Sequence, residues 1–297
     1  MPELPEVGTR VSLRYRLPAG SVPPLSDVVG HLLDVGPTLR VRDKRGDVVT
    51  VAAVDVVSIR PLSAMPVRTS EIRNLEHAAA LAWPGVEQQW IDGWLLRFGH
   101  GSTRRANSAV PLLPWPHPDL GAIVEWYAGR GAPPLIAAPD RLFLIPPGAP
   151  TDGENVVMTR QLTGVVAPDV PSVTLTSRPD DDWLALHPRG VPADVLTAVV
   201  DGEVAFASVA GAAVGRGAVT VAPDGTRWAG LSAVHVAEGA RRRGLARALC
   251  EALLGWATER GATRAYVQVV TDNAAATTLY ESMGFGAHHR SRYLRLG

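Results

Sequence analysis

The sequence lacks three features, and each absence narrows the choice of protein class. Cys250 is the only cysteine among the 297 residues, which excludes a disulfide framework within the chain and a zinc site built on several thiolates. No apolar run approaches the roughly 18 residues of a membrane span, and the first residues do not follow the pattern of a signal peptide. We therefore expect a cytoplasmic enzyme or regulator with no membrane partner.

Net charge is the third missing feature. The chain has 29 basic and 29 acidic side chains, so its charge alone indicates no polyanionic partner. The first strand-like segment alternates Arg10, Arg14 and Arg16 with apolar residues, yet residues 1–62 hold seven acids against eight bases. This is far from a basic footprint, so we expect these arginines to contact a protein partner or the chain itself rather than nucleic acid.

The residues that are present predict packed α+β domains. Hydrophobic residues make up 46% of the chain and charged residues 20%, which is typical of a protein with sizeable cores. At roughly 150 residues per domain, the length fits two domains or three small ones. Short β-rich segments separated by turn residues predict a small β-barrel over residues 1–62, and residues 58–66 read as its exit and a linker.

The middle of the chain mixes helix and strand signals. Apolar spacing predicts helices over residues 71–82 and 120–127, and β-rich runs predict strands at residues 90–98, 135–137, 142–145 and 156–161. Trp126 and Arg130 followed by Gly-Ala are repeated 130 positions later by Trp256 and Arg260, also followed by Gly-Ala. This echo suggests a duplicated unit, with chance agreement at two helix ends as the alternative.

The last third carries clearer signals. Asp201-Gly202 predicts a hairpin between residues 196–200 and 204–209, and a turn at residues 223–225 predicts a second hairpin. Residues 245–256 have helical spacing, residues 265–270 read as a buried strand, and Asn273 is a suitable N-cap for a short helix.

The segment from Val234 to Ala246 is the most informative part of the sequence. It runs from a strand through a short loop into a helix N-terminus, where backbone N–H groups lack internal acceptors and carry the positive end of the helix dipole. Six arginines stand against three glutamates between residues 238 and 264, within a neutral chain. The sequence therefore predicts an anionic ligand at this loop.

Two motifs resemble the cofactor motifs of the GNAT superfamily of N-acetyltransferases. Arg241-x-x-Gly244-x-Ala246 resembles the loop that binds the pyrophosphate of acyl-CoA, and residues 272–285, with Asn273 and Tyr280, resemble the second cofactor motif. The resemblance covers residues 170–297 well and implies a complete GNAT domain there. Residues 66–166 resemble a degenerate GNAT-like half, because prolines at residues 111–118 replace the loop and proline supplies no N–H donor. The sheets of both units should be mixed and mostly antiparallel.

The whole arrangement resembles actinobacterial acetyltransferases with an N-terminal Src-homology-three-like barrel, and the tandem half is similar to mycothiol synthase. The resemblance implies roles for individual residues. Tyr280 would protonate the departing thiolate, and a backbone N–H on the strand ending at Val236 would stabilise the oxyanion. The implied cofactor-binding residues are Val234, His235, Val236, Arg241, Arg242, Arg243, Gly244, Leu245, Ala246, Asn273 and Tyr280.

The general base stays open at this stage. Gln268 stands where a glutamate is frequent in the family, which leaves His235, Glu203 or a chain of waters to accept the proton of the amine. Arg242 stands where many relatives have glycine. Cys250 reads as a buried structural thiol, and His288 and His289 should point to opposite faces of a strand, which argues against a shared metal.

The resulting hypothesis is an acetyl-CoA-dependent N-acetyltransferase that transfers acetyl directly to a primary amine in a ternary complex, without a metal. A small amine, an amino acid and a protein amine all stay open as acceptor. The alternative is a non-catalytic acyl-CoA-binding regulator whose barrel binds a partner, and such a sensor would not need the acid Tyr280. A monomer is favoured, because a duplicated chain can cover its own sheet edges.

Overall fold

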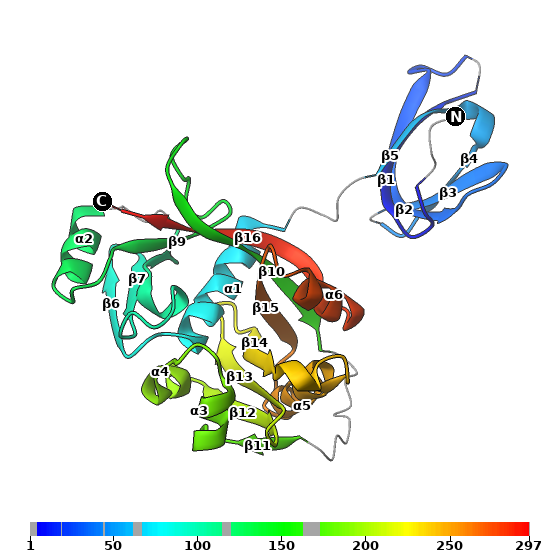
Figure 1. The fold of residues 1–297 in the computed structure, drawn as a ribbon. Helices are drawn as coiled ribbons and strands as arrows, with labels where there is room; N and C mark the ends of the chain where they lie inside the picture. The colour runs from blue at the N-terminus through cyan, green and yellow to red at the C-terminus, as the bar shows by residue number, and fades with distance from the viewer. Residues whose placement is uncertain are drawn as a thin grey trace. The chain divides into compact units, whose positions relative to one another are not determined.

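A computed structural model describes residues 5–18, 20–43, 45–61, 67–114, 120–162 and 173–296. The chain divides into two compact units, Met1–Pro66 and Val67–Gly297 (Figure 1). The expected linker at residues 62–66 and the proline-rich residues 115–118 lie outside the described residues. No helix in the described part of the chain is long and apolar enough to cross a membrane.

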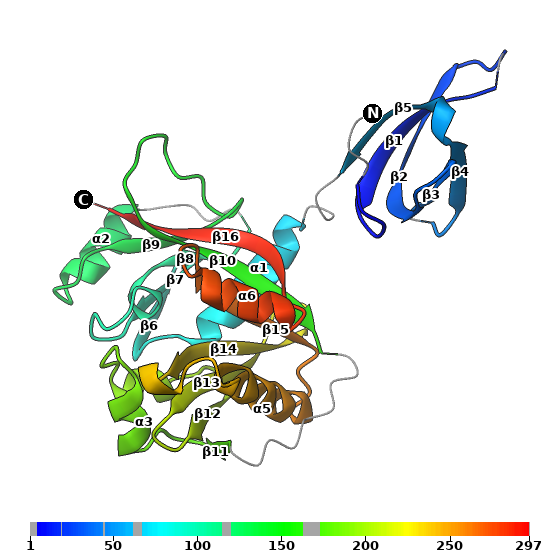
Figure 2. The same ribbon diagram turned by 45° about the vertical axis from the view of Figure 1, so that its right-hand side comes forward.

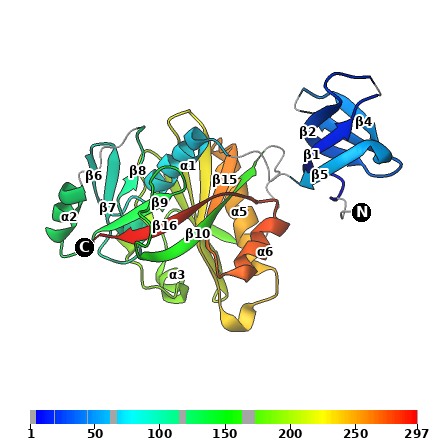
Figure 3. The same cartoon turned by 90° about the horizontal axis from the view of Figure 1, so that it is seen from above.

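The first unit is a five-stranded antiparallel sheet in the order β4-β3-β2-β1-β5 (Figure 3). Its strands are β1 (Arg10–Arg16), β2 (Leu25–Asp34), β3 (Thr38–Asp43), β4 (Val48–Ala52) and β5 (Val56–Pro61), with a 3₁₀ turn at Ala53–Asp55. Alternate residues such as Val11, Leu13 and Val41 are buried in its own core. The predicted small β-barrel is therefore confirmed as an independently packed unit.

The second unit is built on an eight-stranded sheet in the order β11-β12-β13-β14-β15-β10-β16-β9. In chain order these strands are β9 (Leu135–Pro139), β10 (Thr151–Gln161), β11 (Thr174–Thr176), β12 (Glu203–Val209), β13 (Ala213–Val221), β14 (Arg227–Val236), β15 (Arg264–Val270) and β16 (Gly286–Arg295). A separate three-stranded sheet contains β6 (Glu87–Ile91), β7 (Trp94–Phe98) and β8 (Val110–Pro111). The mixed α+β class is confirmed, with β14 and β15 as a parallel pair.

Strand β10 connects the middle of the chain to its last third. It pairs with β15 on one side and with β16 on the other, both antiparallel (Figure 2). Its residues Val157 and Met158 belong to cores on opposite faces of the sheet. The middle region therefore supplies a central strand to the sheet of the last third, and residues 67–297 pack as one unit.

Helices cover both faces of this sheet. α5 (Leu245–Glu259) and α6 (Ala274–Ser282) pack on one face, where Leu253 and Tyr280 meet Val267. α1 (Thr69–Ala82) packs on the other face, where Leu75 meets Tyr266. The remaining helices are α2 (Leu120–Ala128), α3 (Asp181–Leu186) and α4 (Ala193–Thr197), with 3₁₀ turns at Arg105–Asn107 and Glu238–Ala240. Tyr266 and Val267, successive residues of β15, point to opposite faces of the sheet, as a strand requires.

The echo between the two halves extends into three dimensions. Arg130 lies 3.7 Å from the ring of Trp126 and binds Glu87 at 2.8 Å, at the start of β6. Arg260 lies 4.5 Å from the ring of Trp256 and binds Glu203 at 2.8 Å, at the start of β12. In both halves the arginine also donates to the carbonyl oxygen of its tryptophan. A shared helix-end arrangement of three interactions favours duplication over chance.

Three strand predictions are wrong: those for residues 196–200, 142–145 and 90–98. Residues 196–200 do not form the first arm of a hairpin: α4 ends at Thr197, and an extended segment leads to the turn at Asp201. Residues 142–145 are turn and irregular structure. Residues 90–98 are two strands of a hairpin, because Asp92 and Gly93 adopt positive φ and turn the chain.

His288 and His289 do not point to opposite faces as the alternation rule predicts. A β-bulge shifts the register of β16 between Ala287 and His289, so that the two Nδ1 atoms lie 2.7 Å apart. His289 Nε2 lies 2.8 Å from Oε1 of the buried Glu76 on α1. The pair is part of a buried polar chain beneath α1.

Candidate functional site

Strands β14 and β15 lie side by side over only part of their length. Residues 228–231 pair with residues 264–267, and beyond Leu231 strand β14 has no pairing with β15. Ala233 has φ +52° and the register with β13 shifts around it, which makes a β-bulge. The strands diverge from this point, and a cavity of about 660 Å³ opens between them.

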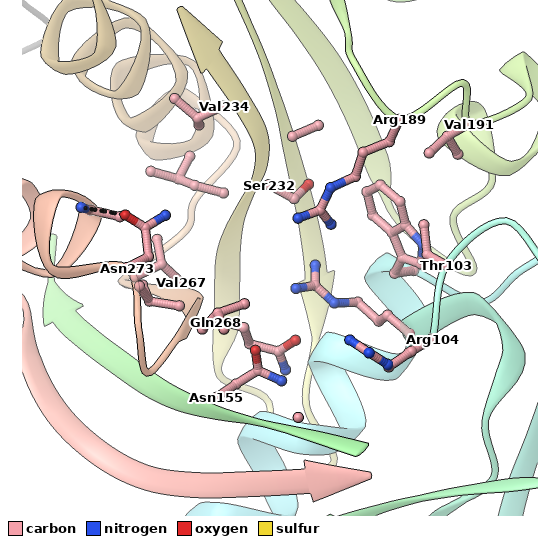
Figure 4. A pocket seen from close by; sticks show the side chains of 18 of the residues that line it. Thr103, Arg104, Asn155, Arg189, Val191, Ser232, Val234, Val267, Gln268 and Asn273 are labelled. Carbon is pink, nitrogen blue, oxygen red and sulfur yellow. Dashed lines mark hydrogen bonds between the residues drawn. The ribbon is translucent and has the colours of Figure 1, made fainter.

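The cavity passes between the two strands. Val234, Val267 and Asn273 lie at the end near α6, while Ser232 and Gln268 lie in the middle (Figure 4). The opposite end is lined by polar and basic residues of two loops, and we call it the arginine end: it comprises Thr103, Arg104, Arg105, His187 and Arg189. Arg189 reaches from its loop toward Ser232 (Figure 4). The site thus has one apolar end and one cationic end.

The loop before α5 has the conformation that the sequence predicts for an anion site. Arg241, Arg242 and Arg243 are exposed, and Gly244 is the N-cap of α5 with φ +79°. No side chain caps the helix there, so the first-turn N–H groups of Leu245 and Ala246 stay available to a ligand. Arg242 also adopts a positive φ of +63°, a conformation that glycine takes more readily than arginine.

Tyr280 lies on α6 and borders the cavity, although it is 7% exposed. Burial is the main reason why its pKa lies well above 10, so the phenol holds its proton at neutral pH. Cys250 lies beside it in the core, and burial raises the pKa of this thiol to about 12. The Cys250 prediction is confirmed: the thiol is buried and is a poor nucleophile.

Of the two candidate bases, only His235 lies at the cavity. His235 lines it from β14, and burial, followed by the charge of Arg241, lowers the pKa of its imidazole. A neutral imidazole can accept a proton. Glu203 does not line the cavity; it is bound to Arg260 in the duplicated helix-end arrangement described above. Gln268 does line the cavity, as the family position implies.

The arginine end was not predicted from the sequence. Arg104 and Arg105 come from the loop after β7, and His187 and Arg189 come from the loop between α3 and α4. These loops are more than 80 residues apart in the sequence, so no local spacing connects them. His187 stacks on Trp183 at 5.3 Å between ring centroids, and burial, then Arg189, lowers the pKa of its imidazole to about 4.

Side chains cap the N-termini of α3 and α6. Asp180 caps α3 by accepting the N–H of Trp183 at 2.8 Å. Asn273 likewise caps α6 by accepting the N–H of Ala276 at 3.1 Å. Within the described residues, no group of three or more His, Cys, Asp or Glu side chains is placed to hold a metal ion.

Family models match most of the chain. A model described as "Probable histone acetyltransferase Rv0428c C-terminal" matches residues 69–294. A second model, described as "Rv0428c N-terminal Sm-like domain", matches residues 5–60, the barrel. Both matches coincide closely with the two compact units of the structure.

Individual proteins are also similar to the chain. The chain is 53% identical over 293 residues to the "Probable histone acetyltransferase Rv0428c" of Mycobacterium tuberculosis, covering 98% of this chain and 95% of the relative. It is 28% identical over 251 residues to the uncharacterized N-acetyltransferase YobR of Bacillus subtilis, covering 74% and 97%. A GCN5-related N-acetyltransferase from Kribbella flavida has the same fold, with a TM-score of 0.52, 16% identity, and 78% and 96% of the two chains covered.

Proposed function

Since the chain belongs to the acetyltransferase family of the Rv0428c C-terminal domain, with a GNAT fold, we propose that it is an acetyl-CoA-dependent N-acetyltransferase acting on a primary amine. The observation that carries this proposal is the divergence of β14 and β15, with β14 connected through the 3₁₀ turn Glu238–Ala240 to the uncapped N-terminus of α5. The first feature leaves backbone groups of β14 without a partner on β15, where an extended arm can bind, and the second offers N–H groups to an anion.

The residues around this divergence fit acetyl-CoA. Arg241 to Ala246 would hold the pyrophosphate through backbone N–H groups and added positive charge. Val234, His235 and Val236, on the part of β14 that is not paired with β15, would hydrogen-bond the pantetheine arm. Asn273 lines the same end of the cavity and would lie along that arm. Acetyl-CoA supplies the acetyl group as an activated thioester.

The transfer needs one acid and one base besides correct placement. A new C–N bond forms as the C–S bond breaks, the nitrogen loses one proton, and the departing sulfur gains one. Tyr280, protonated at neutral pH, would donate the proton to the sulfur. His235, neutral at the same pH, or a water held by it would accept the proton of the amine. N–H groups of β14 beyond Leu231 would stabilise charge on the carbonyl oxygen.

Titration calorimetry with acetyl-CoA tests the binding part of this proposal. The double variant Arg241→Ala, Gly244→Glu should lose binding, because it removes a cation and places a carboxylate where the pyrophosphate would lie. A matched control, Arg178→Ala with Gly211→Glu, changes an exposed arginine and another positive-φ turn glycine away from the cavity. The control should bind as the wild type does, and absence of wild-type binding in the folded protein would reject the proposal.

The class of amine acceptor and the role of the barrel extend this proposal. The name of the M. tuberculosis relative refers to histones, so a protein lysine is one acceptor class, and small amines are the other. A second candidate function is an acyl-CoA-binding regulator whose barrel binds a partner; the separate core of the barrel is the observation that favours it. Turnover distinguishes the two, since a regulator binds acetyl-CoA without releasing free thiol.

We also propose a domain division in which residues 1–62 form the barrel, residues 66–166 the degenerate half and residues 170–297 the half that carries the cofactor site. Support comes from the repeated Trp-Arg-Glu arrangement, which marks the helix end of each half. The shared strand β10 makes the two halves one packed body. A monomer is the proposed state of the chain.

A further inference from the structure

The arginine end concentrates positive charge that acetyl transfer to an amine does not by itself require. Arg105 and Arg189 line it, and the structure gives neither of them an ion pair with a described carboxylate. The Nε atom of Arg105 is buried without a hydrogen-bond partner in the described part of the chain. The Arg105 guanidinium lies 5.5 Å from the centroid of the Trp83 ring, and a guanidinium over a ring can still donate hydrogen bonds from its edge. Both arginines can therefore bind an anion that enters the cavity.

The other charged lining residues are already neutralised. Arg104 binds Asp152 at 2.6 Å. Glu154, the carboxylate of the lining, binds Arg290 at 2.7 Å. Each of these pairs has no net charge, so the excess positive charge at the arginine end comes from Arg105 and Arg189.

Two further guanidiniums lie buried behind the lining. Arg216 is 1% exposed, donates to the carbonyl oxygens of Leu196 and Ala82 at 2.6 and 2.9 Å, and reaches the lining residue Ser232 at 3.4 Å. Arg97 is 4% exposed and donates to backbone and hydroxyl oxygens of Ser108. Neither has a carboxylate partner among its described hydrogen bonds, although an uncompensated buried charge is costly.

One carboxylate stands against these cations from the neighbouring helix. Glu76 of α1 attracts Arg97 electrostatically without a hydrogen bond to it. The Oε1 atom of Glu76 instead lies at hydrogen-bond distance, 2.8 Å, from Nε2 of His289. Burial is the main cause of the lowered pKa values of His187 and His235, and nearby positive charge adds to it: Arg189 at His187, and Arg241 at His235. The field at the arginine end is therefore positive.

We propose that the amine acceptor is a small molecule that also carries a carboxylate, as an amino acid does, and that Arg189 and Arg105 bind this carboxylate. The inference rests on the proposed function, because it assumes acetyl transfer at this cavity. A planar guanidinium without a carboxylate partner is the side chain best suited to hold a carboxylate through two parallel hydrogen bonds. A carboxylate would also supply the missing counter-charge.

The same field discriminates against the other acceptor class. A lysine-rich polypeptide brings several positive charges to a cavity that is already cationic, and like charges in a site of low dielectric repel strongly. For a small amino acid, the carboxylate offsets this repulsion while the cations lower the pKa of the bound ammonium. Part of the work of a general base is thereby done by the site, which suits a chain with Gln268 at the usual glutamate position.

Matched acceptor pairs test the proposal on the full-length protein. Thiol release from acetyl-CoA is measured with L-phenylalanine against 2-phenylethylamine, with L-leucine against 3-methylbutylamine, and with a lysine-rich peptide. We expect kcat/KM to be higher for the acid of each pair by about tenfold or more, and to be lowest for the peptide. Equal or lower values for the acids, or no turnover with any acid, overturn the inference.

Variants locate the effect. Arg189→Gln should reduce kcat/KM for the acids by about tenfold while the value for the matched amines changes much less, and Arg105→Gln should act in the same direction. Arg178→Gln removes the same charge from an exposed loop away from the cavity and should leave the preference intact. Loss of the acid preference in the control but not in Arg189→Gln rejects the assignment. Calorimetry with acetyl-CoA separates the two failures, since only failure of the proposed function abolishes that binding.

Discussion

The acid assigned to the transfer depends on a single hydroxyl. Tyr280→Phe removes that group and keeps the buried ring, which packs edge-on against Phe285 at 5.6 Å between centroids. We expect kcat with an amine substrate to fall by about 100-fold, because a positioned acid contributes that much to a proton transfer. The Kd for acetyl-CoA measured by calorimetry should change by less than about twofold, since the ring still borders the cavity.

Cys250→Ala is the matched control for Tyr280→Phe, because the thiol lies beside the phenol and is also buried. Direct transfer requires no cysteine, and a thiol with its pKa raised to about 12 is not ionised at neutral pH. The variant should therefore keep its turnover. If Cys250→Ala is inactive while Tyr280→Phe is active, the roles of the two residues are wrong.

His187 makes stability depend on pH in a direction that follows from its surroundings. Burial and Arg189 hold the pKa of the folded-state imidazole at about 4, and the unfolded chain titrates near its ordinary value of 6.5. Between these values the unfolded state binds more protons, so the free energy of unfolding falls as the pH falls from about 6.5 to about 4. His288, whose pKa is also lowered to about 4, adds to the same slope.

Replacing the imidazole tests this account. His187→Phe keeps an aromatic ring stacked on Trp183 and removes the titration, so denaturant unfolding of the variant should show a shallower loss of stability between pH 6.5 and pH 4. At pH 8, where neither His187 nor its replacement Phe is charged, the difference in the free energy of unfolding between wild type and variant reports the packing change alone. Identical pH slopes for the two proteins would contradict the assignment of His187.

Residues that act through local geometry could be recognised in the sequence, and those that act across the fold could not. Arg241, Gly244 and Asn273 sit at helix ends, whose chemistry is local, and the structure places them as expected. Arg189 and Arg105 meet only because distant loops share one cavity, and two isolated arginines give no periodic signal. The GNAT resemblance, carried by the local motifs, is confirmed by the family and structural comparisons.

At the scale of the element, the loop before α5 combines two left-handed residues. Gly244 takes φ +79° without strain, but Arg242 takes φ +63° with a side chain that disfavours it. Arg242→Val should lower the free energy of unfolding by about 1–2 kcal/mol, because a β-branched residue is least tolerated there. Arg242→Gly should be at least as stable as the wild type. Urea denaturation of both variants measures the difference, and equal stabilities would show that the loop relaxes.

Elements were predictable where one signal dominated. α5 and β15 follow long apolar patterns, and the structure confirms both. The end of α4 was predicted to begin a strand because Leu196 to Val200 is apolar. Pro192 and Asp194 instead start a helical turn whose apolar side chains are buried against β12 and β13. The bulges at Ala233 and at His288 depend on pairing with other strands, so the sequence of one segment alone does not predict them.

At the scale of the whole molecule, the shared strand β10 determines which fragments can fold. Residues 170–297 alone would lack the strand between β15 and β16, and both faces of the sheet would lose core residues that β10 supplies. We expect this fragment to be insoluble or to lack a cooperative unfolding transition, despite holding every residue assigned to the cofactor. Cooperative unfolding of the fragment, followed by circular dichroism, would contradict this role for β10.

Residues 67–297 should behave differently, because this fragment retains β10 and the entire lining of the cavity. The part removed, the barrel, has its own buried core around Leu13 and Val41, and the described lining residues run from Trp83 to Tyr293. We expect calorimetry to give a Kd for acetyl-CoA within about twofold of that of the full chain, and thiol release from small amines to persist. Loss of turnover with retained acetyl-CoA binding would instead place the barrel in acceptor delivery, and loss of both in a folded fragment would show that the cofactor site depends on the barrel.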